Sequence, residues 1–305
     1  MAITAMAPIA WGANYPVTHH LLPADRPLFG SAARALPAAL LLLALTRTRP
    51  RGSWWWRAAV LGTLNVGAFF VLVYVAAQRL PSGIAATLMA MSSAALLLLA
   101  WPLLGDRPAR RPLLGAVAGV VGVALLVLDG GGGIDLVGVV ASFTAMLMSS
   151  LGFVLGKRWQ PPVPPLTFAA WQLTAGSLVL VPVAVLVEGG PPPPDAGLVA
   201  GIAFGTLIAT ALGYAAWFHG LERLPAGTVG LIGLLNPISG ALIGVGIAGE
   251  PFGAIQVLGA ALVLGGIAAG VVARPTPSRV PAGDLVAGRP DLQPEPATAS
   301  SCGAV

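Results

Sequence analysis

The sequence predicts an all-α polytopic membrane protein with ten transmembrane helices, arranged as two inverted five-helix repeats. Three observations lead to this prediction: an apolar composition, a motif written twice, and basic residues gathered in alternate loops. Hydrophobic residues make up 56% of the 305 residues and charged residues 9%, whereas soluble domains carry roughly 25% charged residues. This composition excludes an ordinary soluble domain, and the long apolar runs exclude a disordered chain.

Ten apolar runs are long enough to cross a hydrocarbon core of roughly 30 Å as helices. They cover residues 3–22, 28–45, 55–77, 83–104, 113–128, 136–155, 166–187, 197–219, 226–248 and 254–273. The first run lacks the basic leading region of a cleaved signal peptide, so we expect it to be a helix of the bundle. Residues 274–305 are rich in Pro, Ala, Gly and Ser, which predicts a disordered cytoplasmic tail.

One motif recurs 144 positions further along the chain. Leu80-Pro81-Ser82-Gly83 begins the first copy and Gly105-Asp106 ends it, while Leu224-Pro225-Ala226-Gly227 and Gly249-Glu250 bound the second. A period of this length indicates a duplicated half of the protein rather than a solenoid unit. We therefore expect one repeat over residues 1–129 and another over 134–273. Since each repeat holds five helices, an odd number, the second enters the membrane from the opposite face.

The loop charges predict the orientation of the helices. Lys and Arg favour cytoplasmic loops because basic loops resist translocation. With both termini in the cytoplasm, 13 of the 16 basic residues fall on the cytoplasmic side, Arg26 and Arg79 fall outside, and Arg34 lies within a helix. The sequence thus predicts a multi-pass membrane protein with both termini in the cytoplasm. The net charge of +5 is explained without a nucleic-acid partner.

Several of these features resemble one known family. They are Trp11-Gly12 in the first run, Arg34 in the second, and the duplicated Leu-Pro-Ser/Ala-Gly to Gly-Asp/Glu segments. Together they resemble the EamA family of the drug/metabolite transporter superfamily over about residues 10–272. This resemblance implies a ten-helix inner-membrane transporter that moves a small metabolite, amino acid-like or amphipathic, by alternating access in the export direction. A non-transporting membrane scaffold or sensor is the alternative.

The two copies of the motif differ at their centres. The second copy carries Asn236-Pro237, whereas the first carries Ser92-Ser93 at the equivalent positions. Proline interrupts the hydrogen bonding of a helix and can kink it. We therefore expect the run over 226–248 to bend where the run over 83–104 does not, so the two repeats are not strictly symmetric.

Polar side chains in membrane helices usually face the bundle interior, so they mark candidate binding residues. Arg34 has two open roles: it can hold a substrate carboxylate or phosphate through its planar guanidinium, or it can be a structural residue that reaches the headgroups or backbone carbonyls. Its mirror position in the second repeat is Gln172, 138 residues on. For the Ser and Asn candidates, hydrogen bonding between helices is the alternative. The full candidate set is Trp11, Asn14, Tyr15, Arg34, Asn65, Ser92, Ser93, Trp171, Gln172, Tyr214, Trp217 and Asn236.

No motif predicts an enzyme, a cofactor or a metal site. No Asp or Glu lies inside an expected helix, which leaves no carboxylate proton relay, and the Gly130–133 run lacks the Lys-Ser/Thr of a phosphate-binding loop. The single cysteine, Cys302, excludes an intrachain disulfide. The expected partners are therefore a small-molecule substrate and the lipid bilayer. Substrate identity, coupling ion and oligomeric state stay open.

Overall fold

The computed structural model describes residues 1–105, 107, 110–128, 135–224, 229 and 232–272. Every regular element within these ranges is helical. The predicted tail over 274–305 lies outside the described residues. So do Asp106 and residues 225–227 of the repeated motif.

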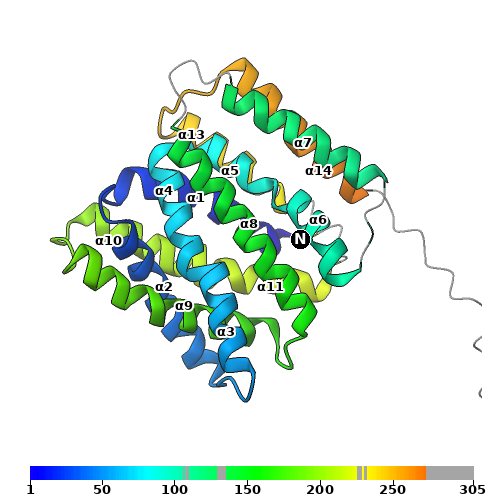
Figure 1. Cartoon of the computed structure of the whole chain (residues 1–305). Helices are drawn as coiled ribbons and strands as arrows, with labels where there is room; N and C mark the ends of the chain where they lie inside the picture. Colours follow the sequence, from blue (N-terminus) through cyan, green and yellow to red (C-terminus); the bar gives the residue numbers. More distant parts are fainter. Residues whose placement is uncertain (106, 108–109, 129–134, 225–228, 230–231, 273–305) are drawn as a thin grey trace, which may run out of the picture. The chain divides into compact units, whose positions relative to one another are not determined.

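The helices follow one another in the chain with short connections (Figure 1). Their bounds are α1 (Ala2–Leu21), α2 (Pro27–Thr46), α3 (Trp54–Gly62), α4 (Ala68–Arg79), α5 (Ser82–Ala90), α6 (Ser92–Leu104), α7 (Arg110–Leu128), α8 (Leu136–Trp159), α9 (Pro165–Glu188), α10 (Ala196–Ala203), α11 (Gly213–Arg223), α13 (Leu235–Gly246) and α14 (Ala254–Val272). Two π-helical segments, η1 (Thr63–Gly67) and η2 (Phe204–Leu212), join α3 to α4 and α10 to α11.

Six helices of the described chain are long and apolar enough to cross a membrane. They are Pro27–Thr46, Trp54–Arg79, Ser82–Leu104, Leu136–Trp159, Pro165–Glu188 and Ala196–Trp217. Leu235–Gly246 and Ala254–Ala269 are shorter apolar helices. The all-helical membrane class is confirmed, while the count of ten helices in two repeats stays a prediction.

The prediction that only the second-half segment departs from a regular helix is wrong. α5 ends at Ala90 and α6 begins at Ser92, so the first-half segment is also interrupted. At the junction, the N–H of Met91 donates to the carbonyl of Leu88 at 3.2 Å, three residues back instead of four. Such a tightened turn interrupts a helix without proline. α13 begins at Leu235, and the turn residue before it, Leu234, lies 143 positions after Met91, so the two interruptions correspond to within one residue of the 144-residue repeat.

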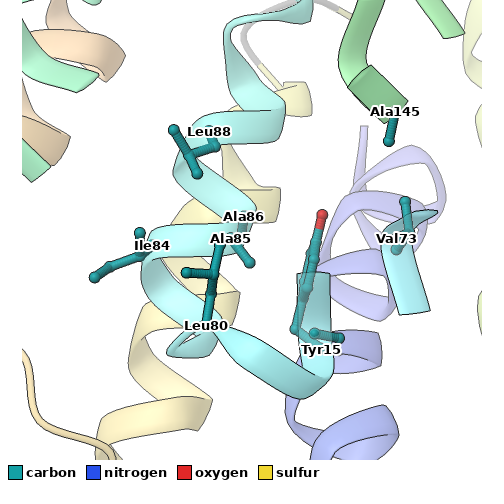
Figure 2. Packing of buried hydrophobic residues seen from close by; sticks show 9 residues of the cluster. Tyr15, Val73, Leu80, Ile84, Ala85, Ala86, Leu88 and Ala145 are labelled. Carbon is teal, nitrogen blue, oxygen red and sulfur yellow. The ribbon is translucent and has the colours of Figure 1, made fainter. Parts of the chain in front are cut away.

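Small apolar side chains bring four helices together around Tyr15. Leu80 and the α5 residues Ile84, Ala85, Ala86 and Leu88 pack with Val73 of α4, Ala145 of α8 and Tyr15 of α1 (Figure 2). Alanines at these contacts let the backbones approach closely, which supplies the van der Waals packing that holds helices together in lipid. This cluster fixes α1, which also carries candidate binding residues, against the first-half helices.

α7 and α14 lie side by side (Figure 1) and approach each other closely where both carry glycines. A Cβ atom built on Gly115 would lie 2.2 Å from the carbonyl oxygen of Gly266, and one built on Gly266 would lie 2.4 Å from that of Gly115. Because no side chain separates the backbones, any larger residue at either position must force the helices apart.

Gly266→Ala is expected to destabilise the protein by about 1–3 kcal/mol through overpacking. Gly265→Ala is the matched control, since nothing lies within 4 Å of a Cβ at Gly265 and alanine favours helix over glycine. Thermal unfolding in detergent should therefore show a lower melting temperature for Gly266→Ala and an unchanged or higher one for Gly265→Ala. Equal shifts in both variants would contradict the close contact.

Candidate substrate-binding site

Arg34 lies two turns into α2 and reaches across to other helices. Its Nε donates to Oγ1 of Thr210 in η2 at 3.0 Å, and its Nη1 donates to Oδ1 of Asn14 in α1 at 3.2 Å. The guanidinium carbon lies 4.0 Å from the centre of the Phe70 ring in α4, a cation–π distance. Arg34 thus links α1, α2, α4 and η2 at one point.

The charge of Arg34 has no acidic partner within 4.0 Å among the described residues. Its hydrogen-bond acceptors are a neutral amide and a neutral hydroxyl. An arginine inside a membrane helix costs on the order of 2 kcal/mol or more unless it is paired. Arg34 is therefore a cation with neutral hydrogen-bond partners only, among the residues that the structure describes.

A narrow recess opens beside Arg34. Its free volume is about 10 Å³, room for roughly one water molecule. It is lined by Asn14, Thr18, Leu22, Gly30, Ser31, Arg34, Phe70, Tyr74, Gly201, Ile202 and Gly205. A volume of this size is too small for an organic molecule.

The π-helical segment η2 shapes one wall of this recess. Thr206 donates from Oγ1 to the backbone oxygen of Arg34 at 3.3 Å, and a Cβ on Gly205 would lie 3.2 Å from Cδ of Arg34. Thr206, Thr210 and Phe70 were absent from the predicted set. The signal that indicates Thr206 and Thr210 is the presence of two hydroxyls four residues apart within an apolar run.

Aromatic residues adjoin the Arg34 site. Trp11 of α1 donates from Nε1 to the backbone oxygen of Ala209 at 2.8 Å, which fixes the indole against η2. Its ring centroid lies 6.3 Å from that of Tyr214 and 5.3 Å from that of Trp217. Trp11, Tyr214 and Trp217 therefore form one cluster centred on Trp11.

Gln172, the mirror position of Arg34, makes a corresponding contact. Asn65 in η1 donates from Nδ2 to Oε1 of Gln172 in α9 at 2.7 Å, while Nε2 of Gln172 faces the Phe168 carbonyl at 3.5 Å. Oδ1 of Asn65 is buried without a hydrogen-bond partner. Arg34 in α2 contacts η2, and Gln172 in α9 contacts η1. The residues that lie 144 positions after η1 fall within η2.

The remaining predicted residues lie elsewhere. Trp171 packs with Trp54 and Phe168, and its Nε1 donates to the Thr48 carbonyl at 2.8 Å. The side chain of Ser93 is exposed. The carbonyl of Ser92 faces Oγ of Ser150 at 3.4 Å. Asn236 lies against Gly12 of α1: a Cβ built on Gly12 would lie 2.4 Å from the backbone oxygen of Asn236. The side-chain Oδ1 of Asn236 is buried and has no hydrogen-bond partner.

Comparison with known proteins places these residues in a family context. The sequence matches the model of the EamA-like transporter family over residues 1–128 and 136–271. It is 38% identical over 240 residues to Protein PecM of Dickeya dadantii (strain 3937), covering 78% of this chain and 80% of that protein. It is 27% identical over 184 residues to the uncharacterized transporter YvbV of Bacillus subtilis (strain 168), covering 59% of this chain and 60% of that protein.

A solved structure described only as a crystal structure of a protein shares the fold. Its TM-score is 0.62 at 19% identity, and the match covers 89% of this chain and 97% of that chain. At this identity the likeness supports the helical architecture alone. The relatives and the matched family are transporters rather than enzymes, where their names state an activity.

Gln172→Leu is expected to destabilise the protein by about 1–3 kcal/mol, because it removes the acceptor of the buried Nδ2 of Asn65. Asn65→Leu together with Gln172→Leu should cost less than the sum of the two single changes, with a coupling on the order of 1 kcal/mol. Thermal unfolding of the four proteins of this cycle measures the coupling. Additive effects would show that the pair makes no specific contact.

Proposed function

The chain belongs to the EamA-like transporter family, and from this premise we propose that it exports a small metabolite by alternating access. The transported compound is amino acid-like or amphipathic and carries an anionic group. The single observation that supports this proposal most is Arg34, which lies beside a recess with neutral partners only among the described residues. A structural arginine would be expected to have a carboxylate or several carbonyls around it.

In this proposal the anionic group binds the guanidinium of Arg34, replacing the weak contacts to Asn14 and Thr210. The aromatic cluster of Trp11, Tyr214 and Trp217 offers ring faces for the apolar part of the compound. Gln172 of the second repeat forms the corresponding polar contact, with Asn65 of the first repeat. Because one repeat contributes a cation and the other an amide, the proposed site is asymmetric.

Alternating access requires two halves that can exchange their arrangements. The family model matches two stretches of nearly equal length, which supports a duplicated chain of two five-helix repeats. The helix interruptions at Met91 and Leu234, which correspond to within one residue, support it further. Two inverted halves have related states of similar energy, one open to each side of the membrane.

We place the protein in the inner membrane with both termini in the cytoplasm, because of the loop charges. A C-terminal fusion to a fluorescent reporter that folds only in the cytoplasm should then be bright, and a fusion to a phosphatase active only outside it should be inactive. The opposite pair of results would reverse the orientation.

Flux through the purified protein in liposomes tests the transport activity. Vesicles loaded with a panel of amino acids, amphipathic carboxylates and drugs should release or exchange at least one compound faster than empty-liposome controls. Absence of both efflux and exchange across the panel would favour the alternative, a membrane scaffold or sensor.

Arg34→Gln is expected to weaken binding of an anionic substrate about 10- to 100-fold, as the loss of a charged hydrogen bond predicts, while leaving assembly intact. Asn14→Asp should also abolish binding, but by supplying a carboxylate next to Nη1, and it should raise the melting temperature of the empty protein. Ligand-dependent thermal shifts in detergent measure both effects.

Arg57→Gln is the matched control for loss of a cation, because Arg57 lies in α3 among Trp54, Trp56 and Trp159 rather than at the site. Its ligand response should equal that of the unmodified protein. If Arg34→Gln instead lowers the melting temperature and keeps the ligand response, Arg34 has a structural role.

A further inference from the structure

The N-termini of α2, α5, α8 and α10 are capped in two different ways. α8 and α10 take their caps from the preceding residue: Oδ1 of Asp135 accepts from the N–H groups of Val137 and Gly138, and Oδ1 of Asp195 accepts from that of Leu198. α2 and α5 have no side-chain cap of their own. Both receive carboxylates from more than 150 positions further along the chain.

Glu250 supplies the cap of α5. Its carboxylate accepts from the backbone N–H of Ser82 at 2.5 Å and from Oγ of Ser82 at 2.6 Å. Nε2 of His20, at the end of α1, lies 3.9 Å from the same carboxylate. The backbone N–H of Glu250 donates to Gly244 in α13 at 2.9 Å, so the carboxylate is held to α13.

Glu188 supplies the cap of α2. Its two carboxylate oxygens accept from the N–H groups of Leu28 and Phe29, each at 2.8 Å. Arg26, directly before α2, donates to the backbone oxygen of Glu188 at 2.5 Å and to that of Gly190 at 3.1 Å. The C-terminal end of α9 is therefore attached to the N-terminal end of α2.

Both caps lie at the same end of the bundle, above the recess beside Arg34. Nε2 of Gln78, next to the end of α4, donates to the carbonyls of Thr18 and Leu22 near the end of α1, and Oη of Tyr74 donates to that of Pro23. Thr18, Leu22 and Tyr74 also line the recess. Any widening of the recess toward this end must move these helix ends apart.

We propose that Glu188 and Glu250 are positioning residues that hold this end of the transport pathway closed. Each is a carboxylate of residues 134–273 that caps a helix of residues 1–129; we name the two contacts the cross-half caps. A carboxylate at a helix N-terminus satisfies free N–H groups and interacts favourably with the helix dipole. A cap within one helix survives when the halves separate, whereas a cross-half cap is lost. The cross-half caps therefore bias the protein toward the closed form.

This inference rests on the proposed transport function, but its test needs no substrate. Cys302 is replaced by serine, and Ser31→Cys places a thiol in the recess, where Ser31 is buried. A membrane-impermeant maleimide is applied to intact cells and, separately, to inside-out vesicles. The rate of thiol modification then reports how often this end of the recess opens.

Glu250→Gln and Glu188→Gln are each expected to raise the modification rate about fivefold, the effect that loss of one cap has on an opening equilibrium, and from one side of the membrane only. The matched control is Asp195→Asn, which likewise removes the negative charge of a capping carboxylate, here one within α10, and should leave the rate unchanged. Equal rates in the three variants, or an increase from both sides, would overturn the proposal.

A second substitution separates closure from simple stabilisation of a helix end. Pro81 occupies the N-cap position of α5, so Pro81→Asp gives α5 a cap of its own. Added to Glu250→Gln, it should restore the melting temperature yet leave the modification rate high. If it also restores the slow rate, Glu250 is only a cap and the proposal fails. The two proposals can also fail separately. If the Glu→Gln variants are modified faster but the unmodified protein moves no compound of the liposome panel, the transport proposal fails and the closing role of the two glutamates stands.

Discussion

The apolar surroundings of this chain leave no water to satisfy its polar groups, and the rest of the structure depends on that constraint. Backbone groups within the helices satisfy one another, so the exceptions are helix ends, interruptions and polar side chains. The carboxylates at the start of α2, α5, α8 and α10 serve the helix ends. At the surface, the hydrogen bond from Arg79 holds the pKa of the Asp135 carboxyl below its usual range.

Inside the bundle, some polar side chains lack the hydrogen-bond partners that the absence of water would require. Arg34 has an amide and a hydroxyl as acceptors, and Oδ1 of Asn65 is buried without a partner. Both residues contact or belong to a π-helical segment, where the wider turn shifts side chains out of the ordinary helical register. Incomplete pairing makes a polar residue costly for stability and leaves it available to a ligand. The proposed binding residue Arg34 is therefore one of several polar groups in the interior that are incompletely paired.

The repeat in the sequence predicts Gln172 as the counterpart of Arg34, and the apolar runs predict the six long apolar helices that the structure describes. Neither the repeat nor the apolar runs identified Thr206 and Thr210 as neighbours of Arg34, because a π-helical turn leaves no periodic signature in an all-apolar run. The interruption at Met91 escaped prediction because no proline marks it. Partners such as Glu250 and Ser82 are 168 positions apart, and local sequence rules describe caps only within a few residues.

The order of the cross-half caps along the chain has a consequence for biosynthesis. α2 and α5 are made first, yet the carboxylates that cap them follow 160 and 168 positions later. At about 5–20 residues per second, a ribosome needs on the order of ten seconds to cover that distance. During this interval both helices sit in the membrane with their starting N–H groups uncapped by the chain itself. The first half of the newborn protein is thus an incomplete structure, and its maturation waits for the last helices to emerge.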